Sequence, residues 1–384
     1  MENKVAVLMV GLVFILLFSV FVGFEFIGTR QSTPEFFVGV EMAYTNPTFS
    51  DVKDLVDKVK DYTNLFVIGS PEISLNQTLL NMTCDYVSDA GLNFIVLFTD
   101  TQRYSLGNEP KDWIPKARQT YGDKFLAVYR YDEPGGRVLD RVNDSLISEM
   151  SVGETANYTV AAGRYVESLY GHLSYYLYAS PRVITADYGV YWFDYKGGYN
   201  TVLAEFGNNH SRPLNIALCR GAARAHEKDW GSIITWEYTG WPYIESADAL
   251  YQDLVLSYRN GAKYAVVFNY PKVDRYGILT EDRLNAMKDF WNYVQSNPQD
   301  FGVESADVAY VLPKDYGFGF RSAVDHVWLW DADELSTKVW DDVNKLESQY
   351  GSHFDVVYDD PETFAAIQNR YSKLFFWNET IPVG

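Results

Sequence analysis

Strand-like and helix-like stretches alternate along most of the chain. Short apolar runs rich in β-branched residues recur, and the stretches between them carry apolar positions at helical spacing, as in residues 51–62. The expected strands cover residues 36–44, 64–70, 92–100, 125–134, 182–193, 214–222, 231–241 and 263–271, and a short helix is expected near 199–206. Eight strand–helix units over roughly 260 residues predict a closed α/β architecture, the (β/α)8 or TIM barrel.

A doubly wound open sheet is the rival fold. It usually carries a glycine-rich turn after its first strand, and the segment EMAYTNPTFS at that place contains no glycine. Beyond residue 300 the pattern becomes a small β-α-β-α-β set, with strands expected at 306–317, 353–360 and 371–379. We therefore predict three parts: a membrane anchor over 1–30, the barrel over 31–300, and a small α/β domain over 301–384 that packs on the barrel.

The N-terminal segment predicts membrane attachment. Residues 5–24 run without a charge, and about 20 apolar residues are enough to span a bilayer core. A cleaved signal peptide is the alternative, but no A-x-A site follows. Six Asn-x-Ser/Thr triplets begin at Asn76, Asn81, Asn143, Asn157, Asn209 and Asn378. They favour a transmembrane helix with the body outside the cytoplasm, or secretion if the segment is cleaved.

The amino-acid composition limits the classes of molecule that the protein is expected to bind. The net charge of −19 disfavours nucleic acid and anionic membrane surfaces, so attachment has to be hydrophobic. The 30 Tyr and 10 Trp pack cores but also offer flat faces that suit sugar rings. We expect Cys84 and Cys219 to be free thiols, although a disulfide is the alternative. The five histidines include no i, i+4 pair, so no metal or other cofactor is expected.

Two strand ends carry the sharpest candidate chemistry, because barrel enzymes place their sites at the C-terminal ends of the strands. The fourth strand ends in Asp132-Glu133-Pro134, and the seventh ends in Trp236-Glu237-Tyr238. A single Glu at a strand end is usually a cap or an ion-pair partner. Two of them on opposite sides of a barrel mouth can face each other across a sugar, as hydrolysis of a glycosidic bond requires.

These motifs resemble the superfamily of retaining (β/α)8 glycosidases that includes the β-galactosidases. The resemblance implies that Glu133 is the acid/base and Glu237 the nucleophile of a cell-surface glycoside hydrolase. Asp132 departs from the pattern, because the superfamily usually has Asn there to contact the sugar 2-hydroxyl. Some members follow the barrel with a flavodoxin-like α/β domain, which is similar to the unit after residue 300.

Other functions are compatible with the same sequence. Some hexosaminidases use an adjacent Asp-Glu pair with the substrate's acetamido group as nucleophile, which would fit Asp132-Glu133. A non-catalytic glycan-binding or envelope protein could keep the same barrel. A metal-dependent hydrolase would need a His cluster that is missing. The further substrate-binding candidates are Glu41, Asp187, Arg220, Trp236, Tyr238, Trp241 and Tyr270, and Arg220 is expected near Glu237 to keep it ionised.

Overall fold

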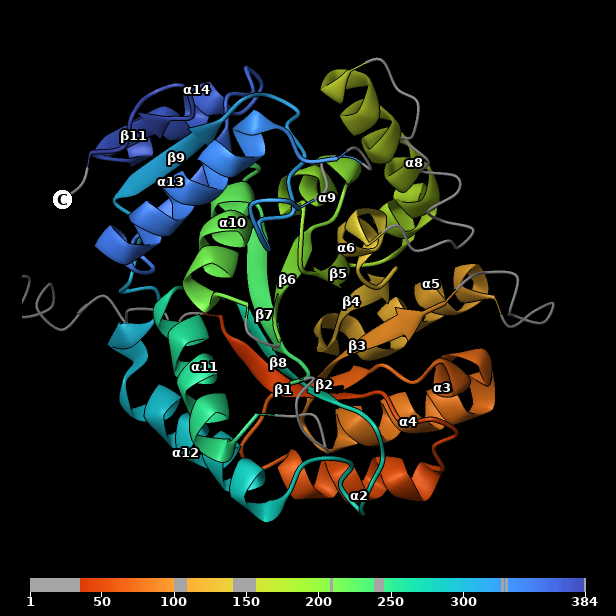
Figure 1. The fold of residues 1–384 in the computed structure, drawn as a ribbon. Helices are drawn as coiled ribbons and strands as arrows, with labels where there is room; N and C mark the ends of the chain where they lie inside the picture. Colours follow the sequence, from red (N-terminus) through yellow and green to blue (C-terminus); the bar gives the residue numbers. More distant parts are fainter. Residues whose placement is uncertain are drawn as a thin grey trace, which may run out of the picture. The chain divides into compact units, whose positions relative to one another are not determined.

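Eight parallel strands close into a barrel in the computed structural model (Figure 1). They are β1 (Phe37–Met42), β2 (Leu65–Ile68), β3 (Asn93–Phe98), β4 (Phe125–Arg130), β5 (Val183–Asp187), β6 (Thr201–Phe206), β7 (Asp229–Ile234) and β8 (Tyr264–Asn269). The strands follow one another around the barrel in chain order, and β8 pairs with β1 to close it. The predicted (β/α)8 barrel is confirmed.

The structure describes residues 35–99, 109–140, 157–207, 210–237, 245–325, 328 and 331–382. The anchor predicted over residues 5–24 lies outside these ranges. None of the helices within them has the length and apolar character needed to cross a membrane.

Helices surround the barrel and cover its outer face (Figure 1). They are α2 (Phe49–Val59), α3 (Pro71–Leu75), α4 (Gln77–Asp89), α5 (Pro110–Tyr121), α6 (Pro134–Leu139), α8 (Tyr158–Ala179), α9 (Tyr191–Gly197), α10 (Arg212–Ala225), α11 (Ala247–Arg259) and α12 (Glu281–Ser296). One apolar cluster fills the space between strands and helices, and a smaller one, with Leu65, Ile95 and Val266, fills the interior. The interior is therefore a packed core, and only its end is open to a ligand.

The sixth strand differs from the prediction. Residues 214–222, expected as a strand, belong to helix α10, and residues 201–206, expected within a helix, form β6. The side chain of Ser211 caps α10 by accepting a hydrogen bond from the backbone N–H of Leu214 at 3.2 Å, and Pro213 lies in its first turn. Both apolar runs are short, and hydrophobicity alone does not separate a buried strand from a buried helix.

A three-stranded parallel sheet follows the barrel. Its order is β10 (Phe354–Tyr358), β9 (Val308–Leu312) and β11 (Lys373–Phe376), with α13 (Glu334–Tyr350) and the short α14 (Phe364–Ile367) between strands. Within the described residues, single 3₁₀ turns lie at Gly122–Lys124, Pro298–Asp300 and Gln368–Arg370. Both sheets fall within one compact unit, Phe36–Gly384. The likeness of this small sheet to flavodoxin stays a prediction.

Arg220 joins the small sheet to the barrel, which corrects its predicted place at a strand end beside Glu237. It lies in α10 with 1% of its side chain exposed. Its Nε donates to Asp355 at 2.8 Å, and its other N–H groups donate to Asn260 and to the carbonyls of residues 304, 352 and 354. These five bonds use all five guanidinium donors, so Arg220 has none left for a substrate.

Candidate active site at the barrel mouth

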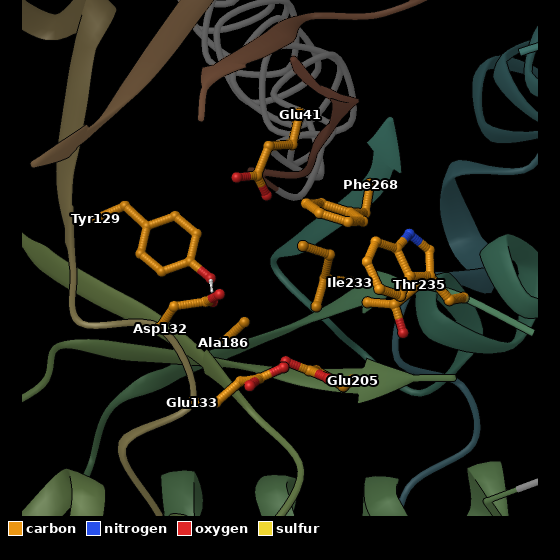
Figure 2. A pocket seen from close by; sticks show the side chains of 10 residues that line it. Glu41, Tyr129, Asp132, Glu133, Ala186, Glu205, Ile233, Thr235 and Phe268 are labelled. Atoms are coloured by element: carbon orange, nitrogen blue, oxygen red, sulfur yellow. Dashed lines mark hydrogen bonds between the residues drawn. The ribbon is translucent and has the colours of Figure 1, made fainter. Parts of the chain in front are cut away.

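A cavity of ≈ 260 Å³ opens at the C-terminal ends of the strands (Figure 2). Four acidic side chains line it: Glu41 near the end of β1, Asp132 and Glu133 just beyond β4, and Glu205 near the end of β6. Glu205 was not among the residues singled out from the sequence, because its strand was assigned as a helix. The remaining wall is largely apolar and aromatic, which is the usual composition of a small-molecule site.

Glu133 and Glu205 form a carboxyl pair. The charge of Glu133 acts on Glu205, and Figure 2 shows the two carboxyl groups pointing toward one another. Two buried carboxylates placed in this way repel each other, which favours a proton on one of them. Burial, aided by the charge of Asp132, raises the pKa of Glu133 to about 8. Burial and then the charge of Glu133 raise the pKa of Glu205 well above its usual range. The pair therefore holds a proton at neutral pH, as a general acid must.

The backbone at Glu133 has an unusual conformation that directs this side chain. Its φ of 54° and ψ of 47° lie in the left-handed region, which residues with a Cβ seldom adopt. The backbone N–H of Glu133 donates to the carbonyl of Ala186 on β5 at 3.0 Å. Strained residues of this kind cluster at functional sites and persist because surrounding structure holds them.

Asp187 holds the turn that follows Glu133. Its carboxylate accepts from the backbone N–H groups of Gly135 at 2.6 Å and Gly136 at 2.8 Å, and also from those of Tyr188 and Gly189. A Cβ on Gly135 would lie 3.0 Å from that carboxylate and 2.1 Å from Val190, so the glycine makes the approach possible. Asp187 was predicted to bind substrate; in the structure its carboxylate is occupied by the backbone of this loop.

A second buried acid supports Asp187 from behind. The side chain of Asp194 accepts from the hydroxyl of Tyr165 at 2.5 Å. Burial and the charge of the nearby Asp187 raise the pKa of Asp194 well above its usual range. Asp194 thus lies between Tyr165 of helix α8 and the Asp187 carboxylate that holds the turn after Glu133.

The other two acids, Asp132 and Glu41, line the same cavity as the pair. Tyr129 donates its hydroxyl to Asp132, and burial raises the pKa of Asp132. Glu41 is 3% exposed, and its Oε2 has no hydrogen-bond partner in the described part of the chain. Burial, aided by the charge of Asp132, raises the pKa of Glu41 well above its usual range. A buried acid without a partner costs free energy, and a ligand hydroxyl in the cavity would supply the missing bond.

An aromatic wall completes the site. Trp236 lines the cavity together with Phe268, and its ring stacks on Tyr270 with centroids 5.7 Å apart. The indole N–H of Trp236 donates to the carbonyl of Tyr270 at 3.2 Å, which fixes the ring. Tyr270 therefore supports the wall from outside the cavity. Such faces suit the C–H side of a sugar ring.

Glu237 follows Trp236 but is not among the residues that line the cavity. It is half-buried, and its charge acts on Glu245, a neighbour in the loop before α11. Tyr238 and Trp241, predicted as substrate-binding residues, lie outside the described ranges. The structure thus brings Asp132, Glu133, Glu41 and Trp236 together, adds Glu205, and places Glu237 outside this group.

No cluster of three or more His, Cys, Asp or Glu side chains suited to a metal ion occurs within the ranges described. The acids of the mouth lie beside one another in a partly apolar cavity, where burial raises their pKa values. Such a group of acids can give and take protons and can hold sugar hydroxyls. Fold and site together define a (β/α)8 barrel with an acid-lined mouth.

Comparison with solved structures finds other proteins that share this fold. An α-L-fucosidase isoenzyme 2 from Paenibacillus thiaminolyticus is 11% identical with a TM-score of 0.51, covering 88% of this chain and 59% of the fucosidase. A β-1,4-mannanase from Aplysia kurodai is 8% identical (TM-score 0.40; 66% and 92% covered). A psychrophilic family 10 endo-β-1,4-xylanase is 14% identical (TM-score 0.43; 66% and 96% covered).

The likeness to the fucosidase shows the fold alone, and the chain spans less than two thirds of the fucosidase's length. No protein-family model matches the chain, and no curated protein matches its sequence. The chemistry therefore has to be argued from the residues of the mouth.

Proposed function

We propose that this protein is a glycoside hydrolase whose catalytic pair is Glu133 and Glu205. The observation that carries the proposal is the pair of facing carboxyl groups in the barrel mouth, which places an acid and a nucleophile beside the same ligand space. An aromatic wall for the sugar ring and two further acids for its hydroxyl groups, Glu41 and Asp132, support it.

Glu133 takes the acid/base role in this proposal, as the Asp-Glu-Pro resemblance implies, and Glu205 takes the nucleophile's role. Glu133 gives its proton to the glycosidic oxygen while a carboxylate oxygen of Glu205 attacks the anomeric carbon. The bond to the leaving group breaks, and an ester to Glu205 forms. A water molecule, deprotonated by Glu133, then attacks the same carbon and restores the carboxylate. Because the two carboxyl groups face each other, a proton on Glu205 can pass to Glu133 before the first step.

The arrangement of the pair favours retention over inversion. Retaining enzymes keep their carboxyl groups about 5–5.5 Å apart and inverting enzymes about 6.5–9.5 Å apart. The carboxyl groups of Glu133 and Glu205 face each other directly (Figure 2), which suits the shorter of these separations.

Three matched variants test the pair. With a panel of aryl glycosides, Glu133→Gln and Glu205→Gln should each lose about 10²–10⁴-fold in turnover, because each removes a proton donor or a nucleophile without changing the side-chain shape. Glu237→Gln should keep most of the activity. If instead Glu237→Gln is inactive and Glu205→Gln is not, the nucleophile is Glu237. A wild-type protein that hydrolyses none of the glycosides overturns the proposal.

A substrate-assisted reaction is the second candidate. It is favoured by the position of Asp132, which is adjacent to Glu133 and lines the same cavity. In that mechanism Asp132 steadies the acetamido group, which attacks the anomeric carbon itself. Hydrolysis confined to N-acetylhexosaminides, with Asp132→Asn inactive and Glu205→Gln active, would select it.

We also propose that the barrel lies outside the cytoplasm, held by residues 5–24. The four Asn-x-Ser/Thr triplets in the described ranges support this, because all of their asparagines are exposed: Asn76, Asn81, Asn157 and Asn378. Exposure is what an attached glycan needs. Protein recovered from a glycosylating host should lose mass on enzymatic deglycosylation and should sediment with membranes; an unchanged mass in the soluble fraction contradicts the proposal.

A further inference from the structure

A second cavity adjoins the first. Its volume is ≈ 310 Å³, and it shares Glu133, Glu205 and Thr235 with the first cavity. The carboxyl pair therefore lies at the junction of two spaces. Each volume is near the lower end of the range for small-molecule sites, about 300–1,000 Å³, so each suits one small ring.

The second cavity has a polar, ordered rim. The residues that line only this cavity are Asp140, Tyr188, Gly207, His210 and Arg321. Tyr188 donates its hydroxyl to Asp140 at 2.6 Å, and Arg321 is paired with Asp140 and also with Asp325 at 2.6 Å. Because these side chains are hydrogen-bonded and ion-paired with one another, the rim is preorganised for a ligand.

Arg321 reaches this rim from the segment between β9 and α13, beyond the barrel strands. Its guanidinium lies 5.7 Å from the ring centroid of Tyr188, which follows β5. The part of the chain that carries the small sheet thus contributes a wall to the mouth of the barrel. That contribution gives the segment a role at the site as well as in packing.

The charges at this rim select against anions. Arg321 is paired with two carboxylates, Asp140 and Asp325, and the Glu133–Glu205 pair adds further acid. The desolvated His210 beside Arg321 has a lowered pKa and adds no charge at neutral pH. A neutral ligand rich in hydroxyl groups can donate to the carboxylates, whereas a carboxylate or phosphate on the ligand meets net negative charge.

We infer that the second cavity binds the leaving-group side of the substrate, a neutral sugar ring, so that the scissile oxygen lies at the Glu133–Glu205 pair. This inference rests on the proposed function and deepens it. The enzyme then recognises two consecutive rings, one in each cavity, and the second is chosen by residues outside the barrel strands. Substrates whose leaving residue is a uronic acid are disfavoured.

Glycosyl fluorides separate the two cavities, because fluoride is too small to occupy the second one. The probes are the fluoride and a disaccharide of the sugar that the aryl glycoside panel identifies. His210→Trp fills the second cavity without removing buried packing, and Arg321→Gln removes its cation. For both variants, kcat/KM for the disaccharide should fall at least about tenfold relative to kcat/KM for the fluoride.

The possible results distinguish failure of the second-ring inference from failure of the proposed function. An unchanged ratio for His210→Trp, with thermal unfolding like that of the wild type, overturns the second-ring inference and leaves the proposed function standing. Failure of the wild type to hydrolyse both the fluoride and the aryl glycosides overturns the proposed function itself. In the wild type, oxidation of the leaving ring to a uronic acid should lower kcat/KM at least about tenfold; equal rates contradict the charge argument.

Discussion

At the scale of single residues, the site depends on acids whose pKa values are raised. Glu133, Glu205, Glu41 and Asp132 line one cavity, and burial is the first cause of each raised pKa. A lone buried carboxyl of this kind would lower stability without benefit. Four of them in one cavity, with an oxygen of Glu41 that has no partner among the described residues, indicate a site suited to hydroxyl groups.

The raised pKa of Glu133 has a consequence for stability. Unfolding returns it from about 8 to an ordinary value near 4.5, so between these pH values the folded protein binds more protons than the unfolded one. The contribution of Glu133 to the free energy of unfolding therefore falls as pH rises from about 4.5 through about 8. Glu133→Gln, which is neutral throughout, should gain stability relative to wild type over this interval, as measured by urea unfolding. A difference that does not change with pH contradicts the raised pKa.

At the scale of elements, the turn between β4 and α6 is the part that aims the catalytic acid. Asp187 at the end of β5 accepts hydrogen bonds from four backbone N–H groups. Two of these belong to Gly135 and Gly136, which directly follow Glu133-Pro134. Two strands thus cooperate to hold one left-handed residue. Asp187 acts through Glu133 and is a positioning residue.

Asp187→Asn tests this positioning. The amide nitrogen of the variant would face backbone N–H groups that donate to a carboxylate in the wild type. The free energy of unfolding should therefore fall by about 1–3 kcal/mol. Misplacement of Glu133 should lower kcat by about 10²-fold with little change in KM. Asp194→Asn is the matched control, because its amide oxygen can still accept from Tyr165 and it leaves the Asp187 carboxylate in place. If both variants keep full kcat, the turn does not depend on Asp187.

The barrel and the Asp132-Glu133 site could be predicted from sequence because each leaves a local signal. Eight recurring apolar runs indicate the strands, and a strand that ends in Asp-Glu-Pro indicates an exposed acid at the mouth. Glu205 left no such signal once residues 201–206 were taken for a helix. The Ser211-Arg212-Pro213 start of α10 was the available clue. Arg220 was misplaced by the same error, since its partner Asp355 is 135 residues away and no local pattern reports such a pairing.

At the scale of the whole molecule, the small sheet is joined to the barrel by a buried ion pair. Asp355 is fully buried and accepts from Arg220, Arg224 and Tyr371. A Cβ on Gly221 would lie 2.4 Å from the carbonyl of Val356, so α10 and β10 are packed at backbone distance. Packing this close fixes the position of the small sheet relative to the barrel.

Removing one partner of that pair should be costly. Arg220→Leu leaves Asp355 with less compensation and should lower the free energy of unfolding by about 3–5 kcal/mol in urea titration. Arg224→Leu, at a site where 28% of the side chain is exposed, should cost less. Folded Arg220→Leu should retain kcat, because the residue does not line the mouth. Loss of kcat without loss of stability would support the substrate role predicted from sequence.

Covalent trapping tests the central claim most directly. A 2-deoxy-2-fluoro glycoside of the preferred sugar, with a good leaving group, slows the second step and leaves the sugar attached to the nucleophile. Peptide mass mapping should then find the sugar on Glu205, in the peptide that contains residues 201–206. A label on Glu237, or full turnover without any label, would contradict the Glu133–Glu205 pair.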